Sequence, residues 1–215
     1  MQLFEFKELT DTHVTLVRTM KETFVTLKLS LHKKDLEIDT GIHFLNHMIE
    51  TVAWGACMSI GVKVDTMEGR RLTHAISEDT GITLGKALRT LYDRGIKHGL
   101  NGTGSSLFVL DEALARVVID VVGRRNSFIG LKAKGARLER VEDMLAQDCV
   151  AFIEGLSQGL GGTIHLDILK GHDPHHCWET GCRALGEAIR QVFTENAWRK
   201  PTDNPYFPDE GVAVL

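Results

Sequence analysis

The chain has 215 residues, of which 43% are hydrophobic and 25% are charged. This size and balance are typical of a soluble globular protein and exclude collagen-like or low-complexity architectures. The net charge of −4 gives no reason to expect a nucleic-acid partner. No apolar run approaches the roughly 20 residues of a membrane span, and no secretory signal is visible. We therefore expect no membrane association and a cytoplasmic location.

Alternating and helical patterns predict the elements in chain order. Residues 13–42 alternate as strands do, and they are followed by a helix at 43–56, a strand at 58–64 and a helix at 75–94. The order then repeats, with strands in 106–123, a helix at 142–158, a strand at 162–169 and a helix at 174–196. Each half thus reads strand, strand, helix, strand, helix. The last residues, 202–215, are expected to be extended.

Ten histidines stand in a chain with only two tyrosines, which prompts a search for a metal site. His74 lies four residues before Glu78, and His175 lies four residues before Glu179 with His176 beside it. Residues four apart on a helix share one face, so each pair can close on a single divalent cation. One such pair is weak evidence, because a solvated helix face gives the same pattern; two pairs are stronger.

The two histidine–glutamate pairs belong to an internal repeat. When the sequence is shifted by 101 residues, His74 aligns with His175 and Glu78 with Glu179. The period is about half the chain, which indicates a duplication. We predict an α+β fold made of two such units with pseudo-twofold symmetry, residues 1–100 and 101–215, packed into one compact body. In the upstream helices, His47 aligns with Ala151.

Five motifs in order resemble one enzyme family. They are R-T-M-K-E-T at 18–23, T-G-I-H-F-L-N-H-M at 40–48, H-A-I-S-E-D-T-G-I at 74–82, D-E-A-L-A-R-V-V-I-D-V-V-G-R at 111–124 and D-P-H-H-C-W-E at 173–179. Over nearly its whole length the chain resembles the imidazoleglycerol-phosphate dehydratases of histidine biosynthesis. The resemblance implies a tandem duplication of the ribosomal protein S5 domain 2-like type and a large homo-oligomer with sites between subunits. It also implies a small-molecule substrate that loses water while its imidazole ring is held between two divalent ions, expected to be manganese.

The resemblance implies two metal-ligand sets. One consists of His47, His175 and Glu179, and the other of His74, Glu78 and His176. A fourth family ligand of each set falls on Ala75 or Ala151. His43 is a candidate to replace the ligand missing at Ala75, although a packed helix-start residue is an equal alternative. Asp148 and His172 are weaker candidates for the ligand missing at Ala151.

The resemblance also assigns the substrate side. Glu22 and Asp111 are the expected acids of the pocket, and Arg124 is the expected anion contact. His98 stands where the family has a phosphate-binding arginine, and P-D-E-G at 208–211 replaces its phosphate loop, which is unfavourable for a dianion. Trp54 stands where the family has a histidine, which places an aromatic wall beside the pocket.

These departures leave three hypotheses open. The chain is a dehydratase of imidazoleglycerol phosphate, a relative acting on a different imidazole or hydroxy compound, or a non-catalytic homologue. The four cysteines have no disulfide spacing and are expected to be reduced, with Cys177 and Cys182 packed in the interior because manganese-type sites prefer oxygen and imidazole.

Overall fold

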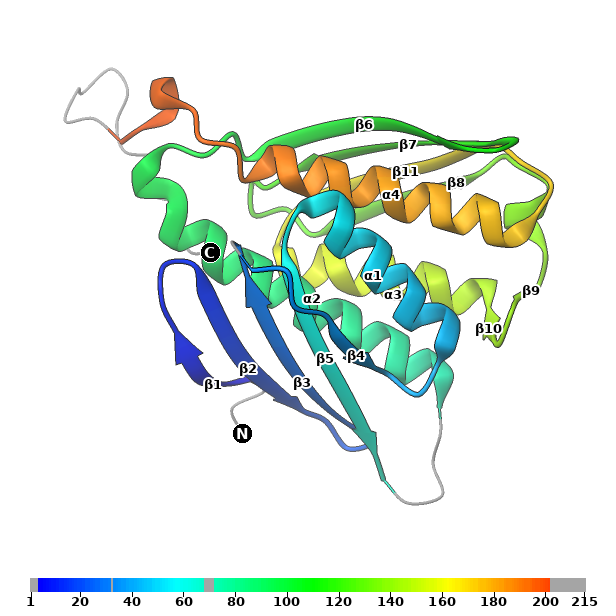
Figure 1. Ribbon diagram of the computed structural model, residues 1–215, viewed down its shortest axis with the longest axis horizontal. Coiled ribbons are helices and arrows are strands. Elements are labelled where there is room, and N and C mark those ends of the chain that lie inside the picture. Colours follow the sequence, from blue (N-terminus) through cyan, green and yellow to red (C-terminus); the bar gives the residue numbers. More distant parts are fainter. Residues whose placement is uncertain (1–3, 32, 68–71, 202–215) are drawn as a thin grey trace.

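The first half of the chain forms a mixed sheet and two helices (Figure 1). The computed structural model describes residues 4–31, 33–67 and 72–201, so the predicted extended tail and 208–211 lie outside the described residues. The elements are β1 (Phe4–Leu9), β2 (His13–Thr19), β3 (Thr23–Ser30), β4 (Glu37–Asp39), α1 (His43–Ala56), β5 (Ser59–Thr66) and α2 (Thr73–Gly95). The strand order is β1-β2-β3-β5-β4, with β4 parallel to β5 and the other neighbours antiparallel.

The second half repeats this arrangement. After a short turn of 3-10 helix (Ile96–His98) come β6 (Thr103–Leu110), β7 (Ala113–Asp120), β8 (Asn126–Leu131), β9 (Arg140–Val141), β10 (Met144–Leu145), α3 (Ala146–Leu160), β11 (Thr163–Lys170) and α4 (Pro174–Val192). Its sheet has the order β6-β7-β11-β8, with β8 parallel to β11. The series β2-β3-β5-β4 is thus reproduced strand for strand, and the predicted α+β duplication is confirmed.

The structure contains strands that the sequence pattern did not predict. They are β1, β8 and the short β9–β10 hairpin, whereas β4 lies within the segment 13–42 that was predicted as strands. β1 and β8 lie at sheet edges and are exposed or half-exposed along their length, so their residues show little hydrophobic alternation. The predicted helix at 142–158 begins later, at Ala146, because Glu142 has a φ of +48° and lies in the β9–β10 hairpin. A left-handed backbone at that position is incompatible with a helix.

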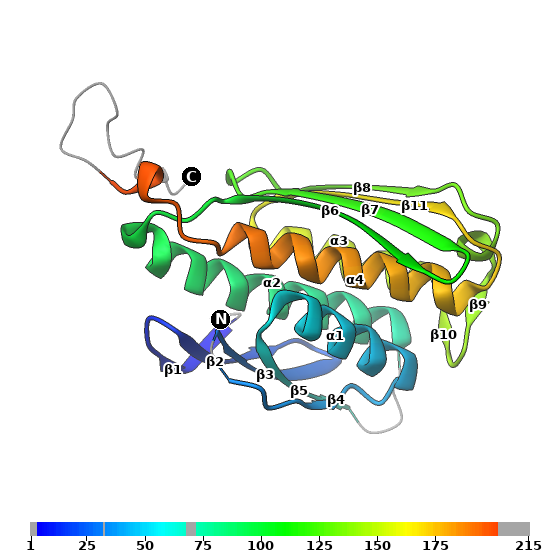
Figure 2. The same cartoon turned by 45° about the horizontal axis from the view of Figure 1, so that its top comes forward.

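The helices lie between the two sheets, as Figure 2 shows. Alternate residues of the inner strands point toward the helices and are fully buried, among them Val25 and Leu27 of β3 and Val117 and Ile119 of β7. This is the period-two burial of a sheet that is covered on one face. Within the described ranges, none of the helices combines the length and apolar character needed to cross a bilayer.

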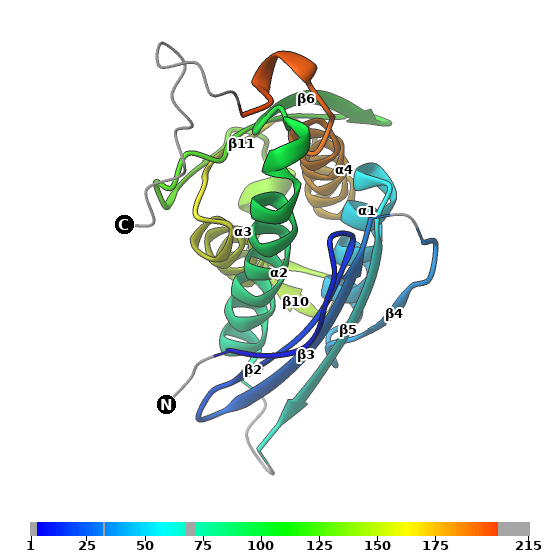
Figure 3. The same cartoon turned by 90° about the vertical axis from the view of Figure 1, so that its left-hand side faces the viewer.

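Each helix of one half packs against a helix of the other half. Figure 3 shows the two pairs, α1 with α4 and α2 with α3. Glycines bring the backbones into contact: a Cβ added at Gly85 of α2 would lie 2.2 Å from the carbonyl oxygen of Leu156 in α3. In the other pair, a Cβ at Gly55 would lie 3.0 Å from Gly186. The two sheets are separate, but the helix pairs join the two halves. The division of the chain into two units at residue 100 therefore stays a prediction.

The β9–β10 hairpin of the second half holds the start of α1. That helix has no side-chain cap of its own. Instead, the Asp143 carboxylate accepts hydrogen bonds from the backbone N–H groups of His43 (2.8 Å) and Phe44 (2.9 Å). A carboxylate at this place satisfies two free donors and faces the positive end of the helix dipole. The start of α1 is therefore fixed by the opposite half.

Two of the sequence motifs meet in a buried ion pair. Arg18 of β2 donates from Nε (3.1 Å) and Nη2 (2.9 Å) to Oδ1 of Asp79 in α2, and Thr23 of β3 donates to Oδ2. All three residues are buried. The motifs at 18–23 and 74–82 thus share a structural role, because this network joins α2 to its sheet.

Candidate metal centre

The structure brings together His47 of α1 with His175 and Glu179 of α4. Their ligand atoms all lie within 4.8 Å of one another. Glu179 Oε2 is 3.4 Å from Nε2 of His47 and 3.2 Å from Nε2 of His175. Within the described part of the chain this is the group of three or more such side chains that could hold one ion, and it matches the first ligand set predicted from the sequence.

Local structure explains why these side chains converge. His175 and Glu179 are one turn apart on α4, so they share a face. The helix begins with Pro174 at its first turn and with the Asp173 side chain accepting from the backbone N–H of His176. The close glycine contact between α1 and α4 then brings His47 across from the first half.

The Glu179 carboxylate is held in its ionised form. Burial raises its pKa, but hydrogen bonds from Arg183 and His47 outweigh burial, so the pKa is below the ordinary value. Arg183 donates from Nε (3.0 Å) and Nη2 (2.7 Å) to Oε1, which leaves Oε2 facing the two imidazoles. An ionised oxygen beside two Nε2 atoms is a suitable donor set for a divalent cation.

A second histidine of α4, His176, lies beside two acids of the β6–β7 turn. Its Nδ1 is 2.9 Å from Oε2 of Glu112, and its Nε2 is 3.7 Å from Oδ2 of Asp111. The hydrogen bond to Glu112 raises the pKa of His176, while backbone N–H groups of Asp173 and His172 and the His176 ring hold the pKa of Glu112 well below its usual range. Asp111 itself is exposed, with a φ of +46°.

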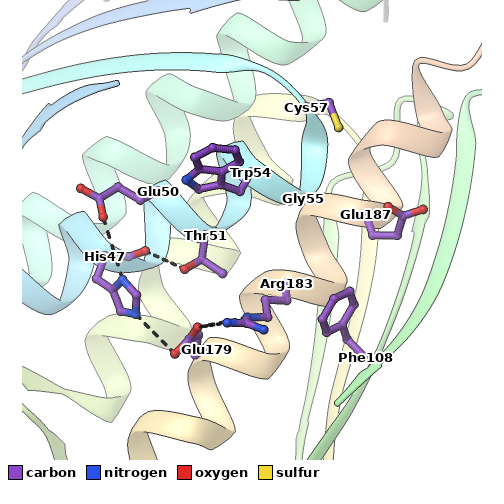
Figure 4. Close-up of a pocket in the computed structure, with 10 residues that line it drawn as sticks. All are labelled: His47, Glu50, Thr51, Trp54, Gly55, Cys57, Phe108, Glu179, Arg183 and Glu187. Carbon is purple, nitrogen blue, oxygen red and sulfur yellow. Dashed lines mark hydrogen bonds and ion pairs between the residues drawn. The ribbon is translucent and has the colours of Figure 1, made fainter. Parts of the chain in front are cut away.

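A groove of about 490 Å³ opens beside the triad. Figure 4 shows His47 facing Glu179, with Arg183 on the other side of Glu179 and Trp54 on the α1 side. Arg183 also lies over the ring of Phe108, at 5.9 Å from its centroid. The structure therefore places Trp54 in the wall of a groove that adjoins the candidate metal ligands, as the sequence predicted.

The second predicted ligand set is not gathered in a single chain. His74 and Glu78 lie exposed on α2, which pairs with α3, whereas His176 lies on α4. Among the described residues these three form no common cluster. Of the candidates for the ligand missing at Ala151, Asp148 lies beside His74, and His172 lies beside Glu112. His43 is exposed at the first residue of α1 and is not part of the triad.

The predicted substrate residues are spread over the chain. Glu22 is half-buried in the β2–β3 turn, and Asp111 and Arg124 stand near opposite ends of β7. His98 follows the C-terminal end of α2, whereas His74 is near its start. Both Arg124 and His98 are exposed. One chain therefore does not bring its predicted phosphate contacts to its histidine triad.

Sequence reasoning missed several residues that surround the histidines. Glu112 and Glu142 contact His176 and His175, and Arg183 holds Glu179. Arg183 lies four residues after Glu179 on one helix, a spacing that predicts the contact. The two glutamates stand on hairpin turns, and no spacing along the chain predicts their contacts with these histidines. Cys177 and Cys182 are buried as predicted, and burial raises their thiol pKa values to about 11 and about 12.

Comparison with known proteins finds relatives of this chain in one enzyme family. A sequence profile described as imidazoleglycerol-phosphate dehydratase matches residues 40–189, more than half of the chain. An imidazoleglycerol-phosphate dehydratase of Vesicomyosocius okutanii is 35% identical over 181 residues, which cover 83% of this chain and 91% of that protein. One from Caldivirga maquilingensis is 36% identical over 177 residues, covering 82% and 88%.

Solved structures agree with the sequence comparison. The crystal structure of the enzyme from Pyrococcus furiosus in complex with (S)-C348 has a TM-score of 0.73 and 27% identity, covering 89% of this chain and 99% of that chain. The Staphylococcus aureus structure, at 24% identity, has a TM-score of 0.74 and shares the fold. By its profile match, its relatives and its fold, this chain belongs to the imidazoleglycerol-phosphate dehydratase family.

Proposed function

We propose that this protein dehydrates imidazoleglycerol phosphate to imidazole acetol phosphate, a step of histidine biosynthesis, with the help of divalent metal ions. The observation that carries the proposal is the triad of His47, His175 and Glu179, assembled from both halves of a chain that belongs to this family. A chain that had lost its chemistry would have no reason to keep three such side chains converging on one point.

The donor set fits the proposed metal. Two neutral imidazoles and one ionised carboxylate suit manganese and similar divalent ions, and a fourth position stays available to substrate. A bound ion would act as a Lewis acid that polarises the substrate and lowers the pKa of the group it contacts. We propose that His74, Glu78 and His176 hold a second ion, as the resemblance implies.

The remaining side chains have proposed tasks in binding and proton transfer. Dehydration requires a proton on the leaving hydroxyl oxygen, and the carboxyl groups of Asp111 and Glu22 are the proposed proton carriers. Arg124 and His98 are the proposed contacts of the phosphate. Trp54 supplies an apolar wall on one side of the groove.

We further propose that the active site is completed between subunits of a homo-oligomer. Support comes from the spread of the predicted residues: His98 follows the end of α2 opposite to His74, and Arg124 stands near the end of β7 opposite to Asp111. Contacts between copies would bring these ends together. Size-exclusion chromatography with light scattering tests this, and a monomer with full activity would refute it.

Metal content and activity test the function together. Protein loaded with manganese should hold close to two ions per chain by elemental mass spectrometry and should convert imidazoleglycerol phosphate to a ketone product. His47→Ala should abolish turnover. Two bound ions without turnover or saturable binding of this substrate would favour the second hypothesis, a different imidazole or hydroxy substrate, for which His98 in place of an arginine is the supporting observation. No bound metal would favour a non-catalytic homologue.

A further inference from the structure

A buried carboxylate in the first turn of α3 has no hydrogen-bond partner. Asp148 is 0% exposed, and both of its carboxylate oxygens lack a hydrogen bond within the described structure. A carboxylate removed from water without partners is strongly destabilising. Its place near the start of α3 offers some favourable interaction with the helix dipole, but this does not supply a donor.

This carboxylate faces the imidazole of His74. Asp148 Oδ1 lies 3.6 Å from Nδ1 of His74, whose side chain is 63% exposed. The separation is slightly longer than a hydrogen bond, and the last torsion of a histidine side chain is soft. With Nδ1 directed to the carboxylate, Nε2 is the ring nitrogen left for a cation on the exposed side, where Glu78 also lies.

The same arrangement surrounds the assembled triad. His175, the repeat partner of His74, has its Nδ1 3.1 Å from Oε1 of Glu142, while its Nε2 faces Glu179, the repeat partner of Glu78. His176 likewise has its Nδ1 on Glu112. The carboxylates come from different elements: Glu142 from the β9–β10 hairpin and Asp148 from α3. Glu142 and Asp148 do not align with each other in the repeat, yet each carboxylate lies beside Nδ1 of one of the two aligned histidines, His175 and His74.

We propose that Asp148 is a positioning residue for His74. Its carboxylate accepts a hydrogen bond from Nδ1–H, fixes the neutral ring in that tautomer and leaves Nε2 for the second ion. The metal-binding part of this inference rests on the proposed function. A carboxylate in this place raises the basicity of a ligating imidazole and fixes its orientation. Asp148 lies one turn before Ala151, the position at which the second half lacks the histidine that the repeat would place there.

The tautomer of His74 in metal-free protein tests the proposal independently of the function. Solid-state ¹⁵N spectra of histidine-labelled protein at about pH 8.5, where an ordinary imidazole is neutral, are compared with those of His74→Ala to assign the signal. We expect the Nδ1–H form in the wild type and a mixture of tautomers in Asp148→Leu. A wild-type ring protonated on Nε2, or a tautomer unchanged in Asp148→Leu, would overturn the proposal.

Manganese titration followed by electron paramagnetic resonance tests the role in binding. Asp148→Leu should weaken one of two classes of bound Mn²⁺ by about 10- to 100-fold, and Asp148→Asn by less. In the matched control, Glu142→Gln should weaken the other class. Combined with His74→Ala, Asp148→Leu should have no added effect on Mn²⁺ binding, because both act through one ring; additive losses would contradict the proposal.

Thermal unfolding separates positioning from a structural role. Replacing a buried carboxylate by leucine should leave the Tm of metal-free protein unchanged or raise it, while Mn²⁺ binding falls. A lower Tm with unchanged Mn²⁺ affinity would show that Asp148 only supports α3. If Asp148→Leu does not fold, Asp148→Asn carries the same comparison. A correct His74 tautomer in protein that binds no Mn²⁺ would refute the proposed function and leave the Asp148–His74 pairing intact.

Discussion

Nε2 of His47 lies 3.4 Å from Oε2 of Glu179, and this contact joins a helix of the first half to a helix of the second half. Neither half holds the triad by itself, since His47 belongs to α1 and Glu179 to α4. The candidate metal site is therefore a product of the duplication, and it depends on how closely the paired helices approach.

Removing His47 should eliminate the first metal site. We expect His47→Ala to lose about one Mn²⁺ per chain, because the remaining His175 and Glu179 give only two protein ligands. The matched control is His43→Ala, one turn earlier on α1 and outside the triad. Elemental analysis of both variants measures the number of Mn²⁺ ions bound per chain. Loss of metal from His43→Ala would instead support the alternative that His43 replaces the ligand missing at Ala75.

Gly85 should not tolerate a methyl group. A Cβ there would lie 2.2 Å from the carbonyl oxygen of Leu156, so Gly85→Ala must push α2 and α3 apart. We expect a loss of about 1–3 kcal/mol or more in the free energy of unfolding. At Gly181 on α4 the nearest atom would be 3.6 Å away, so Gly181→Ala should be neutral or stabilising. Denaturant titration of the two variants measures the difference, and equal stabilities would contradict the close helix contact.

Asp143 should stabilise the start of α1 in a pH-dependent way. Burial raises its pKa, but the N–H groups of Phe44 and His43 outweigh burial, so the folded pKa lies below the ordinary value of 3.8. A lowered folded pKa means that the stabilisation is present above that value and is lost as the pH falls through the folded pKa.

Asp143→Ala should therefore lower the free energy of unfolding at pH 7 by about 0.5–2 kcal/mol, as the loss of a helix cap does. The difference in the free energy of unfolding between wild type and variant should become smaller as the solution is acidified below about pH 4. Urea titrations at a series of pH values measure this difference in the free energy of unfolding. A difference that stays constant with pH would show that the carboxylate charge is not involved.

The buried pair of Arg18 and Asp79 should show strong coupling. Removing one partner leaves a buried charge unpaired, so Asp79→Ala or Arg18→Met should each cost about 3–5 kcal/mol. The double replacement should cost less than the sum of the single ones, since it leaves no unpaired charge. A thermodynamic cycle from unfolding experiments gives the coupling, and additive losses would argue against a direct role of the pair in stability.

The sequence by itself determined the duplication, the helices that carry the ligands and the pairing of His175 with Glu179. These depend on local periodicity and on residues one turn apart, which any helix places on one face. It also indicated His47 through its resemblance to a family, before any geometry was known. The edge strands β1 and β8 were not predicted, because exposed edge strands need not alternate.

Only the tertiary structure decided which residues surround those histidines. Glu112, Glu142 and Asp148 lie far along the chain from the rings they face, and their approach follows from the packing of hairpins and helices. The structure also separated His74 and Glu78 from His176 within one chain. Contacts between distant segments depend on how the glycine-lined helix pairs pack, and that packing is a property of the whole fold, which local sequence patterns do not encode.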